Sequence, residues 1–199
     1  GDLKQAKELF EKAQAAAEEV DAEALINSLN KQGRIFSRQK EWQKAAPFFQ
    51  QAIELAAQAH DFFQQVESMI DLAEALERLG MSAAAAPLWQ QAREISELEN
   101  YVFLLGRAER VRGNVDYAAG NYAAAFEHYR EHCRYAAQYN TIEYTKSIRK
   151  IYDILLEMPI EEVPPILVSL VDFWTLHGLE KVYPELVKIC EEIQQLVIL

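Results

Sequence analysis

Residues that interrupt helices are scarce in this sequence, because only 7 glycines and 6 prolines stand among its 199 residues. Ala, Leu, Glu, Gln and Lys, which are among the stronger helix formers, are abundant instead. No stretch shows the sustained alternation of apolar and polar side chains that marks a half-buried strand. Apolar residues recur at spacings of three and four, as at Phe49, Ala52 and Ile53. Together these features predict an all-α protein.

Cysteine and long apolar runs are also rare. The only cysteines, Cys133 and Cys190, stand far apart and match no metal-ligand, redox or disulfide-framework spacing. Free thiols of this kind are typical of a reducing cytoplasm. No apolar run approaches the roughly 20 residues that cross a bilayer, and the N-terminus has no signal-peptide core. We therefore expect a cytoplasmic protein without a membrane partner.

Basic residues are in the minority, since 20 Lys and Arg against 31 Asp and Glu give a net charge of −11. Nucleic-acid binding needs a basic face that displaces counterions, so nucleic acid is not the expected partner. Glycine-rich phosphate loops are absent, so no nucleotide cofactor is expected. Half of the residues are hydrophobic and 26% are charged, which favours a folded protein over a disordered one.

Three similar segments recur with a period of 40 residues. Each has a small residue, then an alanine, then an aromatic residue one helical turn further on. These residues are Gly33, Ala45 and Phe49, then Ala73, Ala85 and Trp89, then Gly113, Ala125 and Tyr129. Small side chains let two helices approach closely, and the aromatic ring fills the space between repeats. The pattern predicts that each repeat is a pair of helices.

The segment from Gly113 to Ala125, with its turn at Gly120 followed by Tyr122, resembles the core of a tetratricopeptide repeat. Residues 33–52 and 73–92 resemble the same motif. The resemblance implies a right-handed α-solenoid of stacked antiparallel helix pairs, with the usual period of about 34 residues lengthened to 40. Long repeats of this family resemble those of bacterial signalling regulators and of sensor arrays in signal-transducing ATPases.

The repeat register divides the chain into five segments. They are the second half of a repeat over 1–20, three full repeats over 21–60, 61–100 and 101–140, and a degenerate helical pair with a C-terminal capping helix over 141–199. In the last segment, helices are predicted over 141–157, 163–177 and 181–199. Because the sequence opens within a repeat at Gly1, we expect a fragment of a longer polypeptide.

The candidate ligand-binding residues follow from the resemblance, because in that family the first helix of each pair lines a concave groove. The corresponding positions carry Asn27, Asn30, Arg34 and Arg38 in the first repeat, Glu67, Ile70, Glu74 and Glu77 in the second, and Arg107, Arg110, Asn114 and Tyr117 in the third. Such groups bind the carbonyls and carboxylates of a peptide or a partner helix. The alternative is that they form ordinary polar faces that pair within the chain.

One specialised form of this family clamps a C-terminal dicarboxylate with Lys and Asn, and that clamp is missing here. The second repeat offers Ile70 and Glu74 at the central positions. A carboxylate ligand is therefore expected beside the arginine pair of the first repeat or beside that of the third, because the acidic residues of the second repeat repel it.

The resemblance implies a non-catalytic scaffold that binds a protein or peptide in the concave groove. This scaffold would be the interaction or sensor part of a larger regulatory or signalling protein, and its partner would be a separate chain or another domain of its own. One alternative is a structural oligomerisation module that uses the C-terminal helices. Another is a zinc-dependent hydrolase, because His128, Glu131 and His132 fit an H-x-x-E-H pattern. We expect no catalytic residue, no metal and no cofactor.

Overall fold

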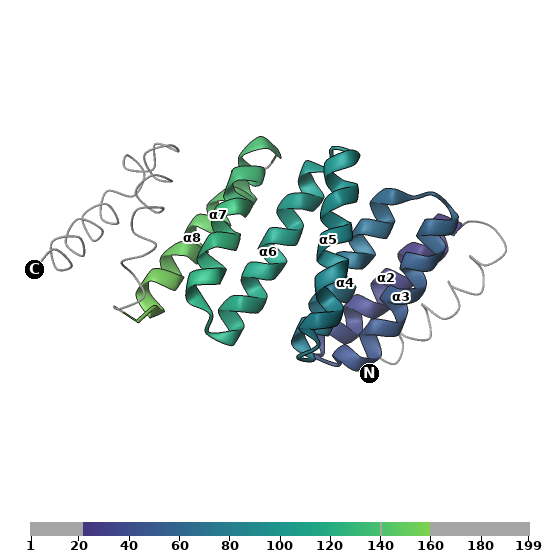
Figure 1. Cartoon of the computed structure of the whole chain (residues 1–199), viewed down its shortest axis with the longest axis horizontal. Coiled ribbons are helices and arrows are strands. Elements are labelled where there is room, and N and C mark those ends of the chain that lie inside the picture. The colour runs from purple at the N-terminus through teal and green to yellow at the C-terminus, as the bar shows by residue number, and fades with distance from the viewer. Residues whose placement is uncertain (1–21, 140, 160–199) are drawn as a thin grey trace, which may run out of the picture. The chain divides into compact units, whose positions relative to one another are not determined.

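The computed structural model describes residues 22–139 and 141–159. The helices, drawn in Figure 1, are α2 (Ala22–Arg38), α3 (Trp42–Gln58), α4 (Phe62–Arg78), α5 (Ser82–Leu98), α6 (Val102–Ala119), α7 (Tyr122–Tyr139) and α8 (Thr141–Glu157). The described residues form no strand. The half repeat predicted over 1–20 and the helices predicted over 163–177 and 181–199 lie outside the described residues.

Consecutive helices pack against one another in pairs. Close contacts join α2 to α3, α3 to α4, α4 to α5, and α7 to α8. The chain divides into two compact units within α6: unit 1 ends at Val111 and unit 2 begins at Arg112. The predicted all-α fold of paired helices is therefore confirmed, and so is the helix predicted over 141–157.

The helices also follow the 40-residue period. First helices begin at Ala22, Phe62 and Val102, and their partner helices begin at Trp42, Ser82 and Tyr122. This spacing supports the division into repeats over 21–60, 61–100 and 101–140, which we keep as an interpretation.

The turns between helices share one backbone conformation. In the five turns from α2 to α7 one residue adopts a positive φ, namely Lys40 at 61°, His60 at 55°, Gly80 at 74°, Asn100 at 57° and Gly120 at 79°. The next amide then closes the turn, as where Glu41 N–H donates to the carbonyl of Phe36 over 3.0 Å. This is the Schellman closure of a helix C-terminus, and glycine adopts its left-handed conformation most readily.

A first prediction concerns Lys40, because a side chain in the left-handed region costs about 1 kcal/mol or more relative to glycine. We expect Lys40→Gly to raise the free energy of unfolding by about 1 kcal/mol, measured by urea unfolding. Lys40→Ala is the control, because alanine keeps the steric cost and should bring no gain. Equal effects of the two substitutions would contradict the explanation.

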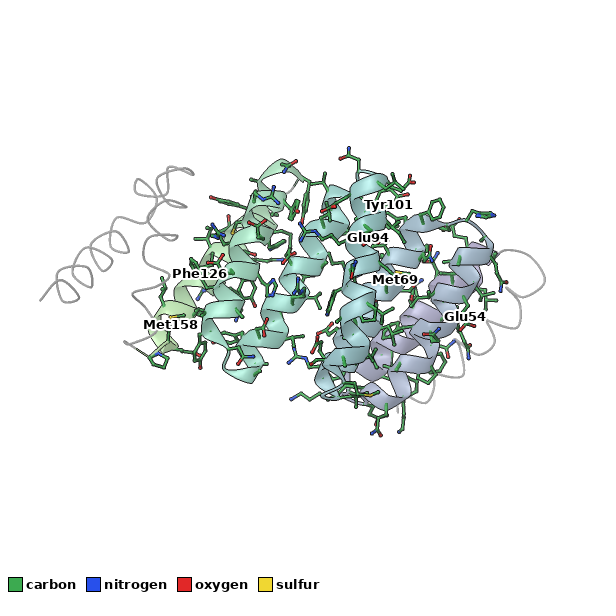
Figure 2. All side chains as sticks on the ribbon, in the orientation of Figure 1. Glu54, Met69, Glu94, Tyr101, Phe126 and Met158 are labelled. Atoms are coloured by element: carbon green, nitrogen blue, oxygen red, sulfur yellow. The ribbon has the colours of Figure 1, made fainter. Side chains whose placement is uncertain are left out.

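The cores of both units consist of apolar side chains that the repeats place on the inner helix faces. In unit 1 the ring of Phe49 lies against Gly33, where an added Cβ would stand 2.5 Å from Phe49 Cε1. In unit 2 the ring of Tyr129 lies 3.2 Å from the corresponding Cβ position of Gly113. The expected close approach of helices at small residues is confirmed at both places. Met69 of unit 1, labelled in Figure 2, is also buried.

The core of unit 2 contains a free thiol, that of Cys133 on α7. The side chain is fully buried, and burial raises the pKa of the thiol to about 12. Because the thiolate is the reactive form, little of it exists near neutral pH. In a Cys190→Ser background we expect Cys133 to react slowly with an aromatic disulfide reagent, and rapidly once urea unfolds the protein. Native reaction as fast as that of free cysteine would contradict this burial.

Candidate functional site

A charged network in unit 1 links three first helices. Asp71 of α4 is only 7% exposed, and it accepts hydrogen bonds from two arginines. Arg34 of α2 donates from Nε to Oδ2 over 2.7 Å, and Arg107 of α6 donates from Nη2 to Oδ1 over 2.5 Å. Each carboxylate oxygen thus has its own guanidinium donor. Charge-assisted bonds of this kind are short and directional, so Asp71 fixes both arginines in place.

Glu67, one helical turn before Asp71, extends the same network. Its Oε1 lies 3.4 Å from Arg34 Nη2 and 3.6 Å from Arg107 Nη1. Its carbonyl also accepts from Arg107 Nη1 over 3.3 Å. Burial alone lowers the pKa of Arg34, but the charges of Asp71 and Glu67 raise it overall, so the guanidinium stays protonated. Two guanidinium groups and two carboxylates therefore balance each other.

A second polar set joins α2 to α4. Gln64 Nε2 donates to Asn27 Oδ1 over 3.2 Å, and Asn30 Nδ2 donates to Gln64 Oε1 over 3.3 Å. The Ser68 hydroxyl donates to Asn30 Oδ1 over 2.9 Å. Asn30 is only 2% exposed, so this candidate residue is occupied in holding the helices together.

Next to the charged network lies a cavity of about 310 Å³, which we call the α2–α4 cavity. Its walls are formed by Arg34, Ser37, Arg38, Trp42, Phe49, Asp71, Glu74 and Arg107. Side chains of α2, α3, α4 and α6 therefore meet at one place in unit 1. Two aromatic side chains and six polar or charged ones line the cavity, so it is more polar than most small-molecule sites, and its volume lies at the small end of the usual range.

Arg38 differs from the other arginines of this cavity. Its side chain is exposed, and within the described residues it makes no hydrogen bond or ion pair. Arg34 and Arg107, in contrast, are paired with Asp71. Arg38 is therefore the arginine of the cavity that has no close carboxylate partner among the described residues.

Glu74 is an acidic residue of the cavity wall whose carboxyl has a raised pKa. Burial raises the pKa of its carboxyl above the ordinary value, and the charge of Asp71 raises it further. The charges of Arg78, Arg107 and Arg110 oppose this effect but do not cancel it. Glu74 therefore keeps a proton to higher pH than an exposed glutamate does.

The remaining candidate residues of unit 1 lie outside the cavity walls. Ile70 is fully buried in the hydrophobic core and offers no surface to a ligand. Glu77 accepts a hydrogen bond from the Ser82 hydroxyl over 2.5 Å, at the turn between α4 and α5. Arg110 contributes a charge that acts on Glu74.

The last two candidates, Asn114 and Tyr117, belong to unit 2 and make contacts there. Asn114 Oδ1 accepts from the Tyr129 hydroxyl over 2.6 Å. The Tyr117 hydroxyl donates to Glu157 Oε1 over 2.7 Å, and Lys150 Nζ lies 4.9 Å from its ring centre. Both residues thus support the packing of their own unit.

A prediction follows from the Tyr117 contact. The hydrogen bond to Glu157, together with burial and negative charge, raises the pKa of Tyr117 from 10.0 to about 12. Because the folded pKa is raised, the stabilising contact is present below pH 10 and is lost as the pH rises towards about 12. We expect the difference in tyrosinate absorbance between the native chain and Tyr117→Phe to titrate in this window. Glu157→Gln should move the midpoint back towards 10, and an unmoved midpoint would contradict the assignment.

The H-x-x-E-H segment of α7 does not assemble a metal centre among the described residues, where no group of three or more His, Cys, Asp or Glu side chains is placed to hold an ion. His132 is buried, with Nδ1 2.5 Å from Ser147 Oγ and Nε2 3.3 Å from the Tyr139 hydroxyl. His128 Nε2 instead lies 3.4 Å from Asp116 Oδ2. The two imidazoles thus have different protein neighbours.

Sequence reasoning missed Asp71, Trp42 and Ser37. Asp71 carried a usable signal, because it is a lone acidic residue within the apolar run from Met69 to Ala73. A carboxylate with apolar neighbours on both sides is expected to be buried when its helix packs against other helices. A buried carboxylate requires a cationic partner. Trp42 and Ser37 carried no comparable signal, since both lie at the ends of helices.

Comparisons with known proteins agree with this architecture. The sequence model of the tetratricopeptide repeat family matches residues 1–58. No curated protein matches the chain. The crystal structure of BtubC (BKLC) from P. vanneervenii superposes with a TM-score of 0.61 at 15% sequence identity, covering 99% of this chain and 75% of that one. No helix of the described residues combines the length and the apolarity that a membrane span requires. Residues 1–58 therefore match the tetratricopeptide repeat family, and the described part of the chain has an all-helical fold in which consecutive helices pack in pairs.

Proposed function

We propose that the chain is a protein- or peptide-binding module whose ligand lies along the first helices of unit 1. Tetratricopeptide repeats generally mediate protein interactions, which supports the class of function. The observation that carries the proposal is the α2–α4 cavity, where a fixed charged network adjoins the exposed Arg38 and two aromatic side chains.

The affinity of the α2–α4 cavity for a peptide comes from side chains that are already held in place before the peptide binds. Asp71 holds Arg34 and Arg107 in one arrangement before any ligand arrives. The ligand therefore does not have to order these long side chains, each of which otherwise costs about 0.5–1.5 kcal/mol on binding. The cavity is small, so it accepts one anchoring residue of a peptide while the rest of the peptide lies along α2 and α4.

In the biological setting we propose, this module is the non-catalytic interaction or sensor part of a larger regulatory protein in the cytoplasm. Its ligand is then a segment of a partner protein or of another domain of the parent chain. The family's common role as a scaffold supports this setting.

Selection of binders from a random peptide display library against the intact chain tests the proposal. We expect Arg38→Ala and Trp42→Ala each to weaken the selected peptides by about tenfold or more, because arginine and tryptophan dominate binding energies. Arg93→Ala is the matched control, since this exposed arginine of α5 pairs with Glu97 and lies outside the cavity walls. Circular dichroism confirms that each variant is folded.

Two results would contradict the proposal. A selection that yields no binder shows that unit 1 does not recognise peptides. Binders that are equally insensitive to Arg38→Ala, Trp42→Ala and Arg93→Ala place the ligand on another surface of the chain.

A further inference from the structure

Two neighbouring turns of unit 1, α3–α4 and α5–α6, form a surface that we call the acidic aromatic edge. Its members are Asp61, Phe62, Phe63, Leu98, Glu99 and Tyr101. We propose that this edge binds a basic amphipathic segment of a partner protein, one that carries lysine or arginine together with apolar side chains. None of its members lines the α2–α4 cavity, so the inference goes beyond the proposed function.

Exposed apolar side chains gather at this edge. Six large apolar side chains are exposed among the described residues, and Phe62, Phe63 and Leu98 are three of them. Leu98, at 82%, is the most exposed of the six. A fourth, Phe103, follows in the first turn of α6. Single apolar residues on a surface are ordinary, but a group of them in adjacent turns marks an interaction surface.

Contacts between the two turns make the edge one fixed surface. The ring centre of Phe63 lies 5.4 Å from that of Tyr101, and the two rings meet edge to face. Tyr101 also packs against the hydrophobic core of unit 1, and its amide donates to the carbonyl of Ser96 over 2.8 Å. The carboxylate of Asp61 caps α4 by accepting from the amide of Gln64 over 3.0 Å. Figure 2 labels Tyr101 at this end of unit 1, where α5 gives way to α6.

The charge around the edge is negative. Arg93 pairs with Glu97 over 2.8 Å, and Arg107, one turn beyond Phe103 on α6, is held by Asp71. Residues 54–66 and 94–106, which build the edge and its surroundings, contain no lysine or arginine and five carboxylates, those of Glu54, Asp61, Glu94, Glu97 and Glu99. With Arg93 counted against the five carboxylates and histidine taken as neutral, four negative charges remain in excess.

Two of these carboxylates act on the aromatic surface itself. Partial burial raises the pKa of the Tyr101 hydroxyl, and the negative charges of Glu99 and Asp61 raise it further. Carboxylates from both turns are therefore close enough to one ring to favour a cation beside it. A lysine or arginine placed there is attracted by the face of an aromatic ring and by the carboxylates.

Charge also distinguishes a basic partner from other occupants of an apolar surface. A second copy of this chain, related by a two-fold axis, would bring Asp61 and Glu99 of both copies together, and like charges oppose such a contact. An anionic membrane surface is repelled for the same reason. A basic amphipathic segment instead covers Phe62 and Leu98 with its apolar side chains and places its cations beside the carboxylates.

Three synthetic peptides of equal length, capped at both ends, test the inference on the intact, isotopically labelled chain. The first carries Leu, Phe and Lys, the second has Glu in place of Lys, and the third has Ser in place of Leu and Phe. Binding is followed by NMR of the backbone amides of residues 60–63 and 98–103. We expect the first peptide to bind about tenfold more tightly than either of the others, and to weaken as the salt concentration rises.

Substitutions decide whether the edge carries this preference. The double variant Asp61→Asn, Glu99→Gln removes two charges, while asparagine keeps the cap of α4. This variant and Phe62→Gln should each weaken the first peptide about tenfold. The matched controls are Glu41→Gln and Met81→Gln, because these residues precede α3 and α5 in the turns at the opposite end of the helix pairs. Both controls should bind as the native chain does, and circular dichroism confirms that each variant is folded.

Four results would overturn the inference. They are equal binding of the Lys and Glu peptides, binding of the Lys peptide that survives the substitutions at the edge, a dimer in light scattering that Phe62→Gln disperses, and sedimentation with phosphatidylserine vesicles that Phe62→Gln abolishes. The third result assigns the edge to a second copy, and the fourth assigns it to a membrane. The proposed function is tested separately, because Arg38→Ala and Trp42→Ala should leave binding at the edge unchanged.

Discussion

Replacement of Asp71 by alanine is expected to lower the free energy of unfolding of unit 1 by about 3 kcal/mol. The carboxylate is buried and accepts hydrogen bonds from two arginines of neighbouring first helices. Its removal leaves Arg107, which is only 13% exposed, with Glu67 as its remaining ionic partner. An incompletely compensated buried charge is far more costly than the loss of an exposed ion pair.

Glu97→Ala is the matched control for Asp71→Ala. Glu97 pairs with Arg93 on the surface of α5, with side chains 51% and 59% exposed, so its loss should cost no more than about 1 kcal/mol. Because the chain has two units, amide hydrogen exchange of α2, α4 and the first part of α6 reports unit 1 separately, alongside urea unfolding. A loss from Asp71→Ala as small as that from Glu97→Ala would contradict the importance of the network.

Gly33→Ala is expected to destabilise unit 1 by about 2 kcal/mol. Alanine normally improves the interior of a helix by about 1 kcal/mol over glycine, so the sign of this effect is diagnostic. The added Cβ would stand 2.5, 2.7 and 2.9 Å from three carbons of the Phe49 ring. This ring is almost fully buried among core side chains, so it cannot move aside without disturbing them.

Gly113→Ala provides the comparison for Gly33→Ala. Its Cβ would stand 3.2 Å from the nearest Tyr129 carbon, so a small shift relieves the contact and the net effect should be near zero. The double variant Gly33→Ala, Phe49→Leu should lose less stability than the two single losses added together, because leucine leaves room for the methyl group. Urea unfolding with hydrogen exchange of α2 and α3 measures these effects. A stabilising Gly33→Ala would contradict the packing explanation.

The helices and their packing were predictable because their signals are local. A small residue, an alanine and an aromatic residue in fixed register determine which faces of two consecutive helices meet. Gly33 and Phe49 accordingly lie in contact, as the repeat pattern indicates. The scarcity of glycine and proline left no ambiguity between helix and strand.

The candidate site was less predictable, because it depends on which side chain faces a neighbouring helix. Ile70 and Asp71 are adjacent in sequence, so they point in directions about 100° apart on α4. Ile70 enters the core, while Asp71 reaches the arginines of α2 and α6. The position carried over from the family therefore falls one residue away from the carboxylate that organises the cavity. The repeat pattern does not show which of the two side chains faces the neighbouring first helices, since either residue can occupy a helix at this position.

The arginines of the candidate site separate two interpretations, namely ligand binding and pairing within the chain. Pairing within the chain, which the sequence left open as an alternative, describes Arg34 and Arg107. Arg38, in the same predicted row, has no such partner among the residues that the structure describes. Sequence spacing places all three on inner helix faces, but only the geometry between helices separates a structural arginine from an available one.

The H-x-x-E-H motif is a similar case on α7. His132 stands where the earlier repeats have a small alanine, and Ser147 of α8 supplies a small polar neighbour for its imidazole. The packing of unit 2 therefore accounts for His132, which is buried against Ser147.

Chemical-shift mapping of the intact chain with a display-selected peptide tests the central claim most directly. The claim predicts that the largest changes occur at the Trp42 indole N–H and at backbone amides from Arg34 to Trp42, and that Arg38→Ala removes them while Arg93→Ala does not. Changes confined to α5, or to α7 and α8 of unit 2, would contradict the assignment of the ligand to the α2–α4 cavity.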